Sequence, residues 1–163
     1  MKSVLRWLWI VSSVCLCAQS PGTGGPPFTI TVTPAQPSVR LGERAMIHIV
    51  LKSLSQEQLP LPEARYPGVQ GELNYRIIVF HTNGTLVPDT ELGWRVKNGQ
   101  PLGSGSVMTR YINFGDEVAE DADLNSVAKI TTPGDYSVRV ERADNRYSDM
   151  HIESNLIVIH VTR

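Results

Sequence analysis

Short segments in which apolar and polar side chains alternate strictly dominate this chain, and each is closed by proline, glycine or asparagine. The stretch FTITVT shows the pattern best, since Phe28, Ile30 and Val32 are apolar while the residues between them are threonines. A period of two places successive side chains on opposite faces of a β-strand, so one face can be buried and the other exposed. Comparable apolar or alternating runs lie at residues 47–51, 72–80, 107–115, 135–143 and 155–162.

The number and spacing of these runs indicate an all-β fold. With one further strand in the acidic stretch after Gly115, we expect seven to eight short strands and almost no helix. Short strands separated by turn residues favour an immunoglobulin-like antiparallel β-sandwich that forms a single domain. A chain of 163 residues is long enough to bury one such core.

Turn residues between the strands predict mostly irregular connections. Asn83 and Gly84 predict a hairpin with a type I′ turn. Prolines and glycines in LPLPEARYPGVQG (residues 59–71) predict an irregular surface connection, and the glycine-rich residues 93–106 predict loops. A short helical turn is expected near Ser126 to Lys129.

The first eighteen residues have the composition of a secretory leader. Lys2 and Arg6 precede an apolar run from Trp7 to Leu16, and small residues follow, as in signal peptides. The apolar run is shorter than the roughly 20 residues of a membrane span. We therefore expect residues 1–18 to be a signal peptide cleaved near Ala18, residues 19–27 a Gly/Pro linker, and residues 28–163 the β-sandwich. This predicts a secreted or periplasmic protein without a membrane span after signal removal.

Both cysteines, Cys15 and Cys17, lie in this leader. The exported domain would then have no disulfide and would be held by its core alone. The chain has 15 basic and 16 acidic residues, a net charge of −1. Such a balance gives no electrostatic basis for nucleic-acid binding.

The stretch TTPGDYSVRV (residues 131–140) contains the clearest structural motif. Pro133 and Gly134 predict a sharp corner, and a strand with alternating side chains follows it. In β-sandwiches a tyrosine at the start of such a strand sends its hydroxyl back to a backbone group. We therefore predict structural roles for Gly134 and Tyr136 and no catalytic role for the tyrosine.

The closing segment TTPGDYSVRVERAD, followed by ESNLIVIHVT, resembles the last two strands of uncharacterised bacterial exported immunoglobulin-like domains. FHTNGTLVP and FGDEVAEDADLNSVAKITTPG resemble a hairpin and an acidic segment of the same domains. This chain departs from their pattern at Phe114, where a proline is common, and at Val127 to Lys129. The resemblance covers most of residues 28–162 and implies the fold without implying an active site. A more distant resemblance is to the intracellular proteinase-inhibitor domain of bacilli.

Few residues point to a ligand or to catalysis. Five carboxylates could supply oxygen ligands to Ca²⁺, although they lack the spacing and the glycine of a calcium loop; they are Asp116, Glu117, Glu120, Asp121 and Asp123. The four histidines lack the short spacings of zinc sites. We therefore predict no metal, no other cofactor and no catalytic residue. Trp94 and Tyr66, in segments expected to be loops, are candidate binding residues.

These observations favour a non-catalytic exported module that presents loops or a sheet edge to an unknown protein partner in the cell envelope or outside the cell, or that supports the envelope structurally. Strand addition at a sheet edge is the simplest way for such a fold to bind. Two alternatives stay open at this point. A proteinase inhibitor would need one rigid exposed loop, for which residues 65–71 and 94–105 are candidates. A carbohydrate-binding module would be centred on Trp94.

Overall fold

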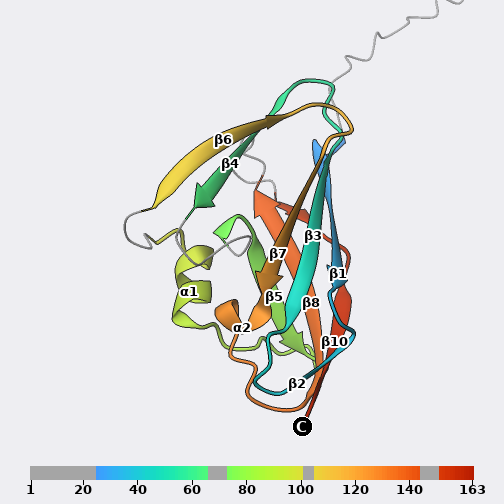
Figure 1. Cartoon of the computed structure of the whole chain (residues 1–163), viewed down its shortest axis with the longest axis vertical. Helices are drawn as coiled ribbons and strands as arrows, with labels where there is room; N and C mark the ends of the chain where they lie inside the picture. The colour runs from blue at the N-terminus through green and yellow to red at the C-terminus, as the bar shows by residue number, and fades with distance from the viewer. Residues whose placement is uncertain (1–24, 66–72, 101–104, 144–150) are drawn as a thin grey trace, which may run out of the picture.

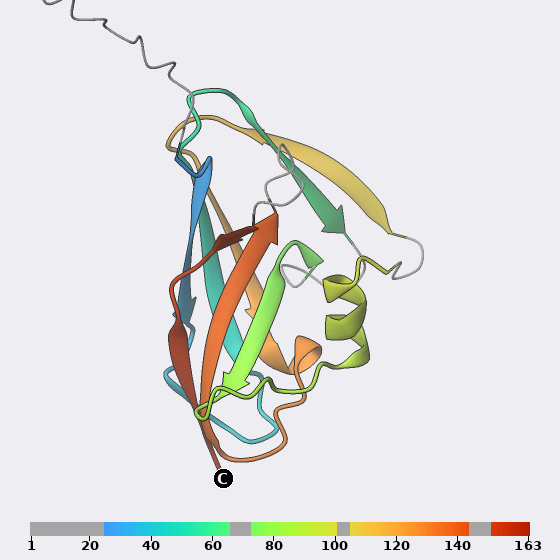
Figure 2. The ribbon, with the colours of Figure 1, turned by 180° about the vertical axis from the view of Figure 1, so that it is seen from behind.

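Two β-sheets pack face to face in the computed structural model, which describes residues 25–65, 73–100, 105–143 and 151–163. One sheet contains, in spatial order, β1 (Phe28–Pro34), β3 (Met46–Ser53) and β7 (Glu117–Asp123). The other contains β2 (Ser38–Arg40), β10 (Ile157–Thr162), β8 (Gly134–Ala143) and β5 (Arg76–His81), with β9 (His151–Glu153) paired to β8. All neighbours are antiparallel except β2 and β10, which run parallel (Figures 1 and 2).

The predicted all-β immunoglobulin-like sandwich is confirmed, but the predicted number of strands is too low. The described residues form ten strands. Two of the additional ones, β2 and β9, have three residues each, too few for an alternating pattern to be visible in the sequence. The third, β4 (Leu59–Arg65), falls in the segment that its prolines marked as irregular.

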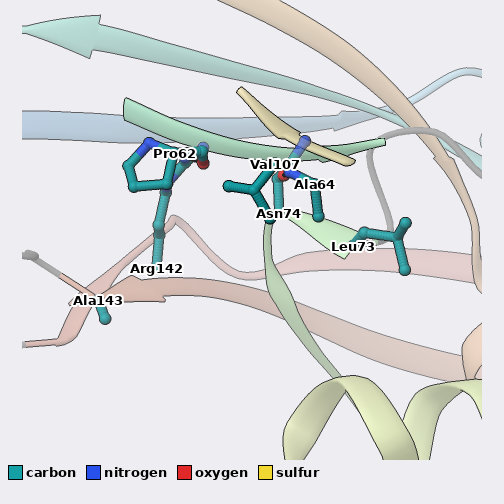
Figure 3. A pocket seen from close by; sticks show the side chains of 7 residues that line it. All are labelled: Pro62, Ala64, Leu73, Asn74, Val107, Arg142 and Ala143. Atoms are coloured by element: carbon teal, nitrogen blue, oxygen red, sulfur yellow. Dashed lines mark hydrogen bonds between the residues drawn. The ribbon is translucent and has the colours of Figure 1, made fainter. Parts of the chain in front are cut away.

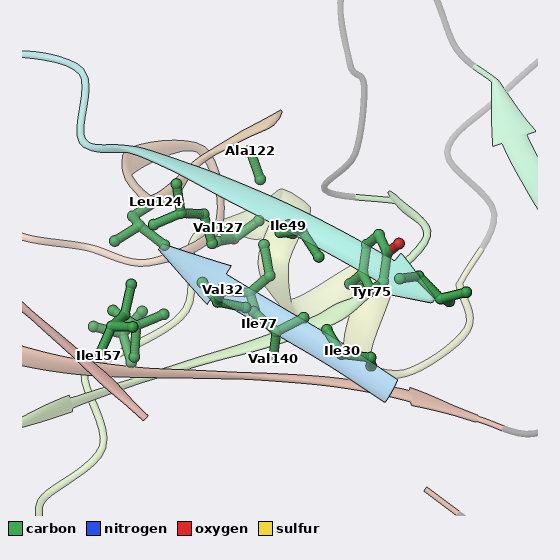
Figure 4. Close-up of a cluster of buried hydrophobic side chains, with 14 of the residues drawn as sticks. Ile30, Val32, Ile49, Tyr75, Ile77, Ala122, Leu124, Val127, Val140 and Ile157 are labelled. Carbon is green, nitrogen blue, oxygen red and sulfur yellow. The ribbon is translucent and has the colours of Figure 1, made fainter. Parts of the chain in front are cut away.

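The alternating side chains meet in one core between the two sheets. In β1 the apolar residues are buried while the threonines between them are exposed. Figure 4 shows Ile30 and Ile49 from one sheet lying opposite Ile77 and Val140 from the other. Burying a side chain of this size contributes about 1.5–3 kcal/mol, so this cluster is the main source of stability in a chain without an internal disulfide in its described part.

A two-stranded ribbon, formed by β4 and β6 (Ser106–Ile112), extends from one end of the sandwich. It continues the antiparallel pair of β3 and β7 past a bend, where Ser53 exchanges backbone hydrogen bonds with Gly115 and Asp116 at 2.9 Å. In both views β6 lies on the outside, and β4 lies between β6 and the sandwich (Figures 1 and 2). The strand β6 is therefore the outermost strand of the ribbon.

The described residues form two short helices, one in a predicted loop and one close to the predicted helical turn. The helix α1 (Glu91–Lys97) lies inside the segment predicted as loops, and that prediction is wrong there. Thr90 caps its first turn by accepting a hydrogen bond from the backbone N–H of Gly93. Gly93 marks a close contact instead of a loop, because a Cβ there would lie 2.0 Å from the Val127 carbonyl oxygen. The helix α2 (Leu124–Val127) begins two residues before the predicted helical turn.

The hairpin at Asn83 and Gly84 forms with a different turn from the one predicted. A type I′ turn needs positive φ at both central residues, but only Gly84 has one, at 81°. The Gly84 N–H donates to the His81 carbonyl, and the His81 N–H donates to the Thr85 carbonyl. This is a three-residue connection closed by a glycine, and the chain returns through a single bridge between Phe80 and Leu86.

No helix in the described part of the chain has the length and apolarity needed to cross a membrane.

Candidate binding edge and the polar cluster beside it

The edge of β4 that faces the sandwich is closed by side chains and prolines. The Arg142 Nη2 donates to the Pro62 carbonyl at 2.7 Å, and the Ala64 N–H donates to the Asn74 Oδ1 at 2.8 Å. Pro60 and Pro62 have no N–H to offer to another strand. The prolines that hid β4 in the sequence therefore mark it as a protected edge.

These bonds also determine which backbone groups of β6 are free. In an antiparallel pair, residues whose N–H and C=O point toward the partner alternate with residues whose groups point away. Pro62 and Ala64 point away from β6, so their partners Thr109 and Val107 point away from β4, as does Tyr111 opposite Pro60. We call the backbone groups of Val107, Thr109 and Tyr111 the outer edge of β6. Among the described residues, none bonds to them.

Apolar side chains surround this outer edge. The exposed fractions are 69% for Val107, 52% for Met108 and 61% for Tyr111. The only charge of the strand, on Arg110, already has a partner, since its Nε lies 2.9 Å from the Glu63 Oε1. A strand whose outer edge is unpaired, with exposed apolar side chains and a neutralised charge, is suited to pair with another strand.

A polar cluster under the ribbon holds β4 in place. The Arg142 guanidinium lies 5.1 Å from the centre of the Tyr75 ring, and Asn74 donates to the Glu120 carboxylate at 3.1 Å. Burial raises the pKa of Tyr75 to about 12; Arg142 opposes this shift, while Glu120 and Glu63 add to it. Although Arg142 is close, no group among the described residues lies in hydrogen-bonding geometry to the Tyr75 hydroxyl.

Two open pockets adjoin this cluster. The first, of about 280 Å³, lies between β4 and the end of β8, and Figure 3 shows Arg142 reaching across it toward Pro62. The second, of about 200 Å³, lies between Tyr75, α1 and the same arginine. A neutral phenol and a guanidinium are hydrogen-bond donors at physiological pH. The buried phenol is therefore neither a base nor a nucleophile at that pH.

Tyr136 and Gly134 lie at the corner where the sequence places them. The Tyr136 side chain is buried, and its hydroxyl donates to the Thr132 carbonyl at 2.6 Å. Gly134, at the start of β8, has a φ of 150°, which a residue with a side chain rarely adopts. His81 packs beside the tyrosine ring, with 5.3 Å between the ring centres. These contacts make the corner a structural feature of the core.

The five carboxylates proposed as calcium ligands do not converge. Asp121 pairs with His48 at 2.8 Å and Glu117 with Lys52 at 3.0 Å on the outer side of the sheet. Glu120 points to the polar cluster, Asp123 caps α2, and Asp116 accepts from the Asn113 N–H in the turn before β7. In the described ranges, no three metal-ligating side chains come together.

The structure describes one of the two candidate binding residues. Trp94 lies on α1 and is 53% exposed, while Tyr66 lies outside the described residues. The structure describes the two candidate inhibitory loops only in part. Residues 66–71 lie outside the described part, and the segment 94–105 begins as a helix and includes residues that are not described.

Sequence reasoning missed the outer edge of β6 and the polar cluster. The alternate prolines of β4 are the signal that could have found the edge, because proline at every second position fits a strand paired on one side only. The cluster has no comparable signal, since Tyr75 and Arg142 are far apart in the chain and meet only in the folded protein.

Comparisons with known proteins add limited information. No model of a protein family matches the chain, and no curated protein sequence matches it. Among solved structures, a CARDB domain of Pyrococcus furiosus in complex with di-metal ions is 13% identical, with a TM-score of 0.44; the match covers 83% of this chain and 92% of that one. A Listeria innocua β-glucosidase in complex with isofagomine is 12% identical, with a TM-score of 0.46, over 83% of this chain and 16% of that one. A Bacteroides uniformis β-glucuronidase is 12% identical, with a TM-score of 0.41, over 81% of this chain and 13% of that one. Similarity this low tells nothing about ligand, activity or partner.

Proposed function

We propose that this chain is a non-catalytic exported immunoglobulin-like module that binds a protein partner by strand addition at the outer edge of β6. The observation that carries the proposal is the contrast between the two edges of the ribbon. Arg142, Asn74 and the prolines occupy the β4 edge, whereas the backbone groups of Val107, Thr109 and Tyr111 have no partner among the described residues. Secretion to the periplasm or beyond is part of the proposal and rests on the leader-like residues 1–18.

The partner should be an extended segment with little charge. Three N–H and three C=O groups at alternate positions provide the hydrogen bonds that a strand needs for affinity, and flanking side chains provide specificity. Val107 and Tyr111 lie on one face of β6 and Met108 on the other, all of them exposed. Apolar residues at alternate positions of the partner would cover them without leaving a charge unpaired.

Site-specific photo-crosslinking tests this proposal. A benzophenone amino acid replaces Tyr111, which is 61% exposed, and in a control replaces Leu156, which is 60% exposed and lies away from the ribbon. Adducts formed with exported proteins of the source organism should come from position 111 and not from position 156. Thr109→Pro, which removes an outward N–H, should abolish them. Equal labelling from both positions, or labelling that survives Thr109→Pro, would refute strand addition at this edge.

A further inference from the structure

We propose that the segment that pairs with β6 is the β6 strand of a second copy of this chain, and this inference rests on the proposed function. The two strands would run antiparallel around a two-fold axis that passes beside Thr109. Thr109 of one copy would then face Thr109 of the other, and Val107 would face Tyr111. A two-fold contact of this kind uses the same surface on both copies.

The direction of the backbone groups supports this register. The residues that point outward, Val107, Thr109 and Tyr111, are all separated by two positions. In the proposed register each outward residue of one copy meets an outward residue of the other. All three become hydrogen-bonded pairs of an antiparallel ladder, with no donor or acceptor left over inside the strand.

The side chains are also complementary in this register. On one face, Val107 lies opposite Tyr111 and Thr109 lies opposite Thr109, and pairs of aromatic with β-branched residues and of two threonines are favourable. On the other face, Met108 lies opposite Arg110. The two arginines, each paired with its own Glu63, are therefore not placed against each other.

The neighbouring symmetric registers are poorer. An axis at Arg110 would place the two arginines directly opposite each other, and like charges at that position are destabilising. An axis at Met108 would place Tyr111 opposite Gly105, beyond the end of β6. Only the register centred on Thr109 pairs all three outward residues with one another.

The closed edge of β4 would end the assembly at two copies. Pairing of two β6 strands produces a four-stranded sheet in which a β4 strand lies at each side. Pro60 and Pro62 lack donors, and the Pro62 carbonyl is already bonded to Arg142. Because neither outer edge accepts a further strand, the copies form a closed pair instead of a fibre.

Charge substitutions at Thr109 test the register in the purified chain. Native mass spectrometry and sedimentation equilibrium should show a mass that rises to twice that of the chain with increasing concentration. Thr109→Lys alone and Thr109→Glu alone should each associate roughly fivefold more weakly, because like charges then lie directly opposite each other. An equal mixture should form heterodimers beyond the half that random pairing gives. Thr109→Pro should be monomeric, with a melting temperature close to that of the wild type at a concentration where the wild type is also monomeric.

Each possible failure has its own meaning. A wild-type chain that stays monomeric at its highest soluble concentration overturns self-pairing. So does a dimer that persists in Thr109→Pro, and so does a mixture with only random pairing. The crosslinking at position 111 separates these results from the proposed function, because an adduct of the chain with a different protein, lost in Thr109→Pro, keeps strand addition and rejects the second copy as partner.

Discussion

The two strands of the ribbon are paired along their whole length, but their other edges differ: the edge of β4 is protected and the edge of β6 is open. The β4 edge carries two prolines, and its Pro62 carbonyl and Ala64 N–H are bonded to Arg142 and Asn74. The outward N–H and C=O groups of β6 have no partner among the described residues, and exposed apolar side chains surround them. The ribbon thus protects one edge and leaves its neighbour open, and this difference is the basis of the proposed strand addition at β6.

The largest expected effect comes from placing proline on the inner instead of the outer side of β6. Met108→Pro should lower the free energy of unfolding by about 2–4 kcal/mol, because it removes a ladder bond and leaves the Glu63 backbone without its partner. Thr109→Pro, one residue away, should cost far less, because the Thr109 N–H points away from β4 and makes no ladder bond. Pro62 already occupies the equivalent position on β4. Chemical denaturation of both variants measures the difference. Equal losses would mean that the orientation of the two sides has been assigned wrongly.

The buried phenol under β4 should make stability depend on alkaline pH. Burial raises the pKa of Tyr75 to about 12, above its ordinary value near 10 in the unfolded chain. The unfolded chain therefore loses this proton first, so the stabilisation is complete below about pH 10 and is lost as the pH rises to about 12. The loss should be about 2–3 kcal/mol. Denaturation of the wild type and of Tyr75→Phe across this pH range isolates the contribution of the Tyr75 hydroxyl. Identical pH profiles for the two proteins would contradict a raised pKa of Tyr75.

The arginine that closes the β4 edge should have a somewhat smaller effect. Arg142→Met keeps the apolar stem but removes the hydrogen bond to the Pro62 carbonyl, and hydrogen bonds of charged groups contribute about 1.5–3 kcal/mol. We expect a loss near 2 kcal/mol by chemical denaturation. Exchange of the Ala64 amide hydrogen should also become faster, because β4 is held less firmly. Unchanged exchange at Ala64 would show that Asn74 alone secures this edge.

The sandwich could be predicted because a strand with one buried face shows alternating apolar and polar residues, as in Phe28 to Val32. The sequence did not predict β4, because Pro60 and Pro62 resemble loop residues until the pairing is known. The glycine of α1 misled in the same way, since Gly93 serves contact with Val127 and not chain flexibility. The open edge depends on which residues of β6 face β4, and a shift of one residue would reverse it. Such a property belongs to the register, which the sequence pattern alone does not contain.

The hydrogen bond from the neutral Tyr136 hydroxyl to a backbone carbonyl can be compared with the bond from the charged Arg142 guanidinium to a carbonyl of β4. Tyr136 donates to the Thr132 carbonyl at 2.6 Å, much as Arg142 donates to the Pro62 carbonyl at 2.7 Å. Tyr136→Phe should cost about 1 kcal/mol, because a bond between neutral groups contributes less than one from a guanidinium. It should leave association through β6 unchanged, since the corner lies in the sandwich core. Denaturation and sedimentation of the same sample measure both quantities, and a loss of association without a loss of stability would show that the corner, and not the open edge, governs binding.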